Sequence, residues 1–155
     1  FSPTCNSNQI QDCSPQELVN TYDNSILYTD AMLDNTIKLL QQHSNNFNTA
    51  LVYLSDHGES LGENGMYLHG TPYMFAPSQQ THIPFLMWLS PEYTKSFSID
   101  RQCLSASAQH DEISQDNLFH TLLGMMNVQT TEYQSALDLL QKCRNQGERI
   151  SQKSP

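Results

Sequence analysis

The chain has 155 residues, which is enough for about one domain. Seven Lys and Arg residues face sixteen Asp and Glu residues, and the formal net charge of −9 argues against binding to nucleic acid or to an anionic membrane surface. No apolar run reaches the roughly 18 to 20 residues of a membrane helix, and the N-terminus has neither an initiator Met nor a signal peptide. We therefore expect an excised or truncated piece of a longer protein.

The four cysteines bear on the cellular compartment. Cys5 and Cys13 flank a short polar loop without the Cys-x-x-Cys spacing of a metal site, which favours a small disulfide loop. Two reduced thiols of a cytosolic protein are the alternative. A bridge between Cys103 and Cys143 stays open, because four cysteines allow three pairings. The even count favours an oxidising compartment such as a bacterial periplasm.

A long helix is the first predicted element. Ser14-Pro15-Gln16-Glu17 combines a Ser N-cap, a Pro at the first helical position and a Glu that closes a capping box. Apolar residues then recur at helical spacing as far as Gln42 and His43. The predicted packing face consists of Leu18, Tyr22, Ile26, Leu33, Ile37 and Leu40.

Two strands are predicted next. Residues 49–54 form a nearly continuous apolar run, typical of a buried parallel strand covered on both faces. Residues 66–80 are expected to form an irregular loop, and residues 81–89 a second strand with Pro84 near its start. The aromatic residues of this region are expected to pack in the core or within loops rather than to form a lipid-binding platform; they are Tyr73, Phe75 and Trp88.

The C-terminal part is predicted to be mainly helical. Residues 90–111 are polar and indicate a long surface excursion. Ser114 is an expected N-cap for a helix that reaches Asn127, and residues 131–144 indicate a further helix. The inward face of the first of these helices is predicted to be Leu118, Phe119, Leu122, Leu123 and Met126. Residues 145–155 have no apolar anchor and are expected to be a disordered tail.

Residues 55–65 carry the chemistry of the chain. They follow the first strand directly, and open parallel sheets bind ligands beyond the carboxyl ends of their strands. Asp56 and His57 offer the oxygen and nitrogen atoms that zinc accepts, beside a tight turn at Gly58. Taken alone, an Asp-His pair is a weak signal, and an Asx-turn with an exposed His is the alternative.

The stretch Ser-Asp-His-Gly-Glu-Ser-Leu-Gly-Glu-Asn-Gly at residues 55–65, followed by Tyr67-Leu68-His69-Gly70, resembles the metal-binding signature of a known family. That family is the phosphoethanolamine transferases that modify lipid A, including the mobile colistin-resistance enzymes. Residues 17–28, 71–77 and 115–124 fit the same family, and Cys5 and Cys13 resemble one of its periplasmic disulfide pairs. The resemblance covers most of residues 5–144.

The resemblance implies a fold, a reaction and a location. The fold is an α/β class, alkaline-phosphatase/sulfatase-like α/β/α sandwich, of which residues 1–144 are a C-terminal portion. The reaction is zinc-dependent transfer of phosphoethanolamine from phosphatidylethanolamine to a lipid A phosphate, the basis of polymyxin and colistin resistance. The location is the periplasm, in a protein attached to the inner membrane by an N-terminal domain.

The resemblance also assigns roles to residues. Asp56 and His57 match zinc ligands, and His69 matches a histidine that contacts the donor phosphate or a second zinc, suited to acid-base work. A His that is merely hydrogen-bonded in a glycine-rich loop is the alternative for His69. Glu59 is expected to orient a ligand imidazole. No residue matches the Thr nucleophile, so the isolated chain is expected to be inactive. The other histidines are expected to be structural or on the surface; they are His43, His82, His110 and His120.

Two other functions remain open at this stage. One is another branch of the sulfatase superfamily, a hydrolase or a phosphoglycerol transferase, with the same metal chemistry and a different acceptor. The other is a non-catalytic, metal-binding fragment. The reading frame upstream of Phe1 would distinguish them, because it would supply or deny the nucleophile and the membrane helices.

Overall fold

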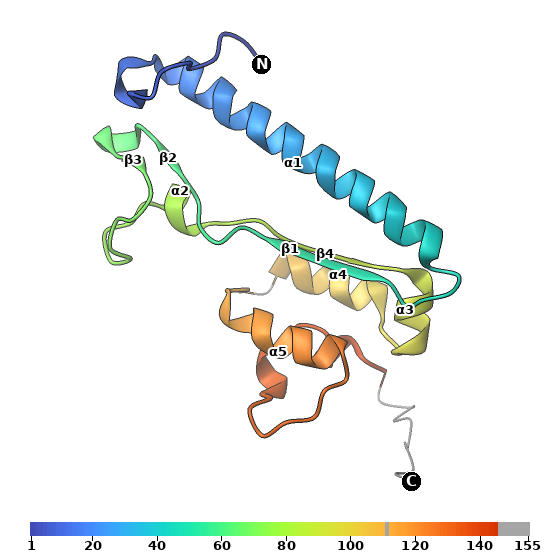
Figure 1. Cartoon of the computed structure of the whole chain (residues 1–155). Helices are drawn as coiled ribbons and strands as arrows, with labels where there is room; N and C mark the ends of the chain where they lie inside the picture. Colours follow the sequence, from blue (N-terminus) through green and yellow to red (C-terminus); the bar gives the residue numbers. More distant parts are fainter. Residues whose placement is uncertain (111, 146–155) are drawn as a thin grey trace. The chain divides into compact units, whose positions relative to one another are not determined.

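The computed structural model describes residues 1–110 and 112–145 (Figure 1). The chain divides into two compact units, Phe1–Leu89 and the part from Ser90 onward. Among the described residues, every helix is too short or too polar to cross a bilayer. Of the tail expected at residues 145–155, all but Asn145 lies outside the described residues, as does the side chain of His110.

The first unit begins with a short 3-10 turn, Ile10–Asp12, and the long helix α1, Pro15–His43. The predicted capping box is present, since the Ser14 side chain accepts from the Glu17 N–H and Glu17 accepts from the Ser14 N–H. The predicted disulfide between Cys5 and Cys13 is also present. On the predicted packing face Leu18 is buried, whereas Ile26 is 49% exposed. The remaining four are half-buried.

The predicted parallel strand is wrong in its direction. Strand β1, Ala50–Leu54, pairs antiparallel with β4, Phe85–Leu89, in a two-stranded sheet with Ala50 opposite Leu89. All five residues of β1 are half-buried. A continuous apolar run indicates that both faces of a strand are buried. It does not show which strand pairs with it or in which direction. Strand β4 begins after Pro84, which lacks the N–H that a ladder needs.

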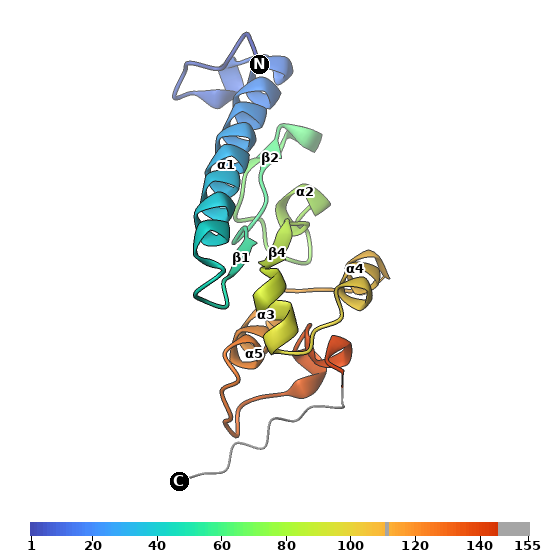
Figure 2. The same ribbon diagram turned by 90° about the vertical axis from the view of Figure 1, so that its right-hand side faces the viewer.

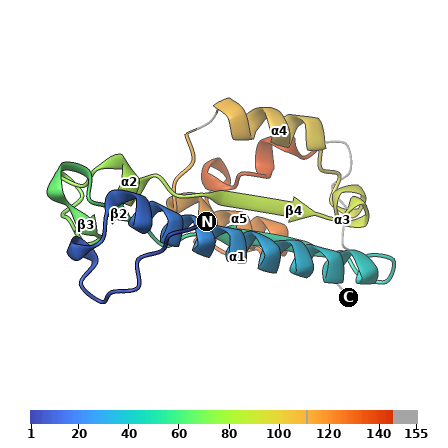
Figure 3. The same ribbon diagram turned by 90° about the horizontal axis from the view of Figure 1, so that it is seen from above.

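The segment between these strands is more ordered than the sequence predicted. Strands β2, Ser60–Leu61, and β3, Tyr67–Leu68, form an antiparallel hairpin around a 3-10 turn at Glu63–Gly65. Helix α2, Ser78–Thr81, precedes β4. In Figure 3 the hairpin and α2 lie at one end of the β1–β4 pair, and the turn that joins α1 to β1 lies at the other end. Figure 2 shows the same grouping from the side.

The second unit contains two helices where a surface excursion was predicted. They are α3, Pro91–Ser96, and α4, Arg101–His110. Helix α3 uses the same start signal as α1, since Ser90 is an N-cap that accepts from the Tyr93 N–H and Pro91 follows it. The disulfide between Cys103 and Cys143, which the sequence left open, joins α4 to the 3-10 turn Gln141–Cys143.

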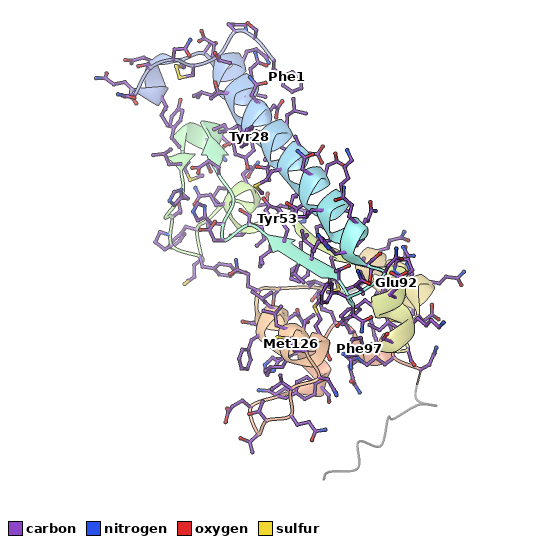
Figure 4. The ribbon with its side chains drawn as sticks, turned by 45° about the vertical axis from the view of Figure 1, so that its right-hand side comes forward. Phe1, Tyr28, Tyr53, Glu92, Phe97 and Met126 are labelled. Carbon is purple, nitrogen blue, oxygen red and sulfur yellow. A yellow bond between two sulfur atoms is a disulfide. The ribbon has the colours of Figure 1, made fainter. Side chains whose placement is uncertain are left out.

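Helix α5, Asp116–Met125, buries a different face from the one predicted. Phe119 is 53% exposed and Met126, labelled in Figure 4, is 65% exposed. The buried face is largely polar and consists of Asn117, His120, Thr121, Gly124 and Met125. Its polar members bond residues 134–139: the Asn117 amide donates to the Leu137 carbonyl, and Thr121 Oγ1 accepts from the Leu139 N–H. Hydrogen bonding rather than apolar periodicity therefore sets the orientation of α5.

The helix predicted for residues 131–144 is wrong. Only two 3-10 turns form there, Ser135–Leu137 and Gln141–Cys143. The buried Asp138 side chain accepts from the Leu140 N–H and from the Tyr133 hydroxyl. A side chain that bonds the nearby backbone in this way competes with the helical hydrogen bonds.

Candidate metal centre

The β2–β3 hairpin brings Glu59 and His69 together. Ser60 lies opposite Leu68 in the hairpin, so the residues just outside this pair, Glu59 and His69, also face each other. The distance between Glu59 Oε2 and His69 Nδ1 is 3.2 Å. The turn that makes this possible contains three left-handed residues, with a φ of 114° at Gly62, 54° at Asn64 and 74° at Gly65. Glycine and asparagine tolerate that region best.

His57 completes a group with these two side chains. The His57 and His69 rings lie 3.8 Å apart between centroids. One ligand atom from each of His57, Glu59 and His69 lies within 4.8 Å of the others. This is a set of nitrogen and oxygen donors of the kind that zinc accepts.

The backbone around His57 favours one tautomer of its ring. His57 Nδ1 lies 2.9 Å from the Gly58 carbonyl oxygen, which can only accept a hydrogen bond. The Nδ1 atom therefore carries the hydrogen, and in the neutral ring Nε2 keeps its lone pair. A hydrogen bond from the ring nitrogen that does not bind the metal commonly orients a metal-binding imidazole.

Asp56 lies beside His57 but outside the three-residue group. Its Oδ2 is 3.8 Å from His57 Nε2, and its side chain is 88% exposed. Two ligand atoms of a tetrahedral zinc, each at roughly 2.0 to 2.2 Å from the metal, lie about 3.3 to 3.6 Å apart. The Asp56–His57 pair is therefore close to the spacing of two ligands.

The Glu59 carboxylate provides the test of whether a cation fits here. Only 23% of the side chain is exposed, and Glu59 Oε1 is buried without a hydrogen-bond partner among the described residues. An unpaired buried carboxylate oxygen is costly unless a donor or a cation satisfies it. The residues present therefore fit a metal ion.

Gln80 holds these segments together and was not among the residues predicted from the sequence. Its carbonyl accepts from the Gly58 N–H at 2.9 Å, its side-chain amide donates to Ser60 Oγ at 2.9 Å, and its Oε1 accepts from the Thr71 N–H at 3.3 Å. Gln80 is 6% exposed and Ser60 is 1% exposed. No sequence pattern indicates this role, because a Gln within a polar segment does not reveal that it is buried.

Three other histidines, His43, His82 and His120, lie outside the group. His43 and His82 are exposed. His120 is buried on α5, where its Nδ1 accepts from the Gln134 N–H. His120 and Gln134 both belong to the second unit, so His120 has a structural role there.

A comparison against protein families agrees with the fold. The sulfatase family matches residues 1–128. The chain therefore belongs to the sulfatase family, and the predicted sulfatase-like α/β class is confirmed.

Within this family the similar proteins are phosphoethanolamine transferases, as the resemblance indicated. Phosphoethanolamine transferase EptA of Salmonella typhimurium is 55% identical over 148 residues, which are 96% of this chain and 27% of that protein. Phosphatidylethanolamine transferase Mcr-1 of Escherichia coli is 42% identical over 114 residues, 74% of this chain and 20% of that protein. The chain thus spans about a quarter of the length of these relatives.

A solved structure agrees with both comparisons. The soluble domain of lipooligosaccharide phosphoethanolamine transferase A from Neisseria meningitidis superposes with a TM-score of 0.90 at 46% identity. The match covers 94% of this chain and 43% of that domain.

Proposed function

We propose that the chain is part of a phosphoethanolamine transferase. It supplies the metal ligands Asp56 and His57 and a histidine that contacts the donor phosphate, His69. The donor is phosphatidylethanolamine, and the acceptor is a lipid A phosphate of the outer surface lipopolysaccharide. The observation that carries this proposal is the assembly of His57, Glu59 and His69 within 4.8 Å. The similarity to EptA and Mcr-1 supports the reaction class, and the Neisseria domain supports a lipopolysaccharide-type acceptor.

Each residue has a separate task in this proposal. Asp56 and His57 hold a zinc ion, with the His57 ring fixed by its contact to the Gly58 carbonyl. When bound, zinc supplies a Lewis acid that withdraws charge from phosphoryl oxygens. Glu59 orients His69 through its 3.2 Å contact with Nδ1, which turns Nε2 toward the donor. His69 then binds the donor phosphate and holds or releases a proton there.

The two disulfides support a periplasmic location. Cys5 pairs with Cys13 and Cys103 with Cys143, so the four cysteines of the chain are all oxidised. Such pairs persist in oxidising compartments and are rare in the cytosol. The proposal therefore places this part of the protein in the periplasm, with its membrane attachment and its Thr nucleophile elsewhere in the whole protein.

The test uses variants in the complete reading frame that contains this sequence. We expect Asp56→Ala and His57→Ala to lose both zinc and phosphoethanolamine transfer, because each removes a ligand. We expect His69→Ala to keep its zinc while transfer falls by about 10². Elemental analysis gives the zinc content, and mass spectrometry of lipid A gives the transfer.

A control and three contrary outcomes complete this test. His43→Ala removes an exposed histidine outside the group and should leave zinc and transfer unchanged. Near-normal lipid A modification by His57→Ala would refute the metal site. If His69→Ala loses its zinc, His69 is a ligand; if it loses only thermal stability, its role is structural.

A further inference from the structure

Three consecutive large apolar side chains project into solvent just after His69. Tyr73 is 85% exposed, Met74 is 87% exposed and Phe75 is 74% exposed. This contradicts the expectation that Tyr73 and Phe75 pack in the core or within the loop. We name these three residues the Tyr73–Phe75 tip. Three consecutive exposed apolar residues are unusual on a surface that faces water unless they have a function.

The tip is a formed turn rather than a loose end. The Phe75 N–H donates to the Pro72 carbonyl at 2.8 Å, and the Ala76 N–H donates to the same carbonyl at 3.0 Å. The Thr71 N–H on one side is bonded to the side chain of the buried Gln80. Gln80 also braces Gly58 and Ser60. The backbone that presents the tip is therefore tied to the backbone of the candidate metal centre.

The segment of chain that carries the tip differs in charge from the chain as a whole. The chain has a net charge of −9, which would repel an anionic membrane. Residues 64–91, however, contain no Asp, Glu, Lys or Arg. No carboxylate or ammonium group of this segment would have to be desolvated if the tip entered an apolar phase.

We infer that the Tyr73–Phe75 tip inserts into the lipid surface that holds the donor. This rests on the proposed function, which makes the donor a membrane lipid. Tyr and Phe with a neighbouring Met suit the boundary between headgroups and acyl chains, about 5 to 10 Å below the surface. Tyr73 is four positions after His69 in the sequence, which corresponds to at most about 14 Å of extended chain. The tip can thus lie among acyl chains while His69 meets the headgroup phosphate of the same leaflet.

The first experiment places a fluorescent reporter on the tip. The four cysteines of this chain are paired, so Met74→Cys introduces a free thiol into it that can be labelled with NBD, and the unsubstituted complete protein, labelled in the same way, gives the background. The matched control is Asn45→Cys, an exposed polar site in the turn that joins α1 to β1; this turn lies at the end of the β1–β4 pair away from the hairpin (Figure 3). Both proteins, made from the complete reading frame, are mixed with or reconstituted into vesicles of phosphatidylethanolamine and phosphatidylglycerol, with and without a doxyl-labelled lipid.

We expect the label at position 74 to shift its emission to shorter wavelength and to be quenched by the doxyl lipid, while the label at position 45 is not. Equal quenching at both positions would refute the inference. A label at position 74 that is shielded from aqueous iodide but not quenched by doxyl lipid would also refute it, because protein then covers the tip. If that shielding grows with protein concentration, a second copy is the cover.

The second experiment separates this inference from the proposed function. Tyr73→Ser, Met74→Ser and Phe75→Ser are combined, and transfer is measured from vesicle phosphatidylethanolamine and from a water-soluble short-chain analogue. We expect the ratio of the two rates, vesicle over soluble, to fall about tenfold or more. An unchanged ratio in an active protein refutes the role of the tip. Failure of the unsubstituted protein on both donors refutes the proposed function instead.

Discussion

A single methyl group at Gly58 is predicted to disturb the metal centre. A Cβ at this position would lie 2.0 Å from the Gln79 carbonyl oxygen and 2.9 Å from the Gln79 carbonyl carbon. Real Cβ contacts stay above 3.0 Å, so in Gly58→Ala the two backbones must separate by about 1 Å. Both are backbone atoms, and no side-chain rotation relieves the overlap.

The cost follows from two contributions. Overpacking of this kind costs about 1 to 3 kcal/mol. Weakening the hydrogen bond from the Gly58 N–H to the Gln80 carbonyl, now 2.9 Å, adds about 0.5 to 1.5 kcal/mol. We therefore expect Gly58→Ala to lower the free energy of unfolding by about 2 to 4 kcal/mol and to weaken zinc binding, because His57 and Glu59 flank the displaced residue.

Denaturant unfolding followed by the fluorescence of Trp88 measures this loss, since the chain has one Trp and it lies on β4 of the same unit. Calorimetric titration with zinc measures the affinity. Gly65→Asn is the control: no atom lies within 4 Å of its added Cβ, and Asn tolerates the φ of 74°. If Gly58→Ala and Gly65→Asn unfold at the same denaturant concentration, the close approach of the Gln79 carbonyl does not restrict the residue at position 58.

Two further predictions concern stability. The disulfides close loops of 8 and 40 residues. Replacing both cysteines of one bridge by Ala should lower the free energy of unfolding by about 2.5 kcal/mol for Cys5–Cys13 and by about 4 kcal/mol for Cys103–Cys143. Equal losses for the two bridges in denaturant unfolding would contradict the dependence on loop length. Burial raises the pKa of Tyr93 and of Tyr133 to about 12. These pKa values are higher in the folded protein than in the unfolded chain, so the stability they contribute is complete below pH 10 and is lost as the pH rises toward 12. Unfolding midpoints between pH 9 and 11.5 should fall, and fall less in Tyr93→Phe; an identical fall in both proteins would show that Tyr93 is not responsible.

The sequence predicted those features whose cause is local. The capping box of α1 depends on Ser14 and Glu17 alone, and both side chains act as expected. The apolar runs located β1 and β4 to within a few residues. The polar groups that directly follow a strand drew attention to this region, and three of the residues singled out as candidates, His57, Glu59 and His69, lie close together.

The features that were missed depend on partners distant in the chain. The direction of β1 is set by its pairing with β4, which no pattern within residues 49–54 encodes. The buried face of α5 is set by bonds from Asn117 and Thr121 to residues 137 and 139. Periodicity counts apolar residues, so a face buried through hydrogen bonds escapes it.

The candidate metal centre is local in the sequence, and this affects how it forms during folding. His57, Glu59 and His69 all come from one short stretch of chain, and a tight hairpin brings the last two together. Closing so short a loop costs little chain entropy, and contacts between near neighbours in sequence form quickly. The donor atoms of this stretch are therefore able to meet early in folding, and a metal ion that binds them then would act as a nucleus around which the surrounding backbone orders.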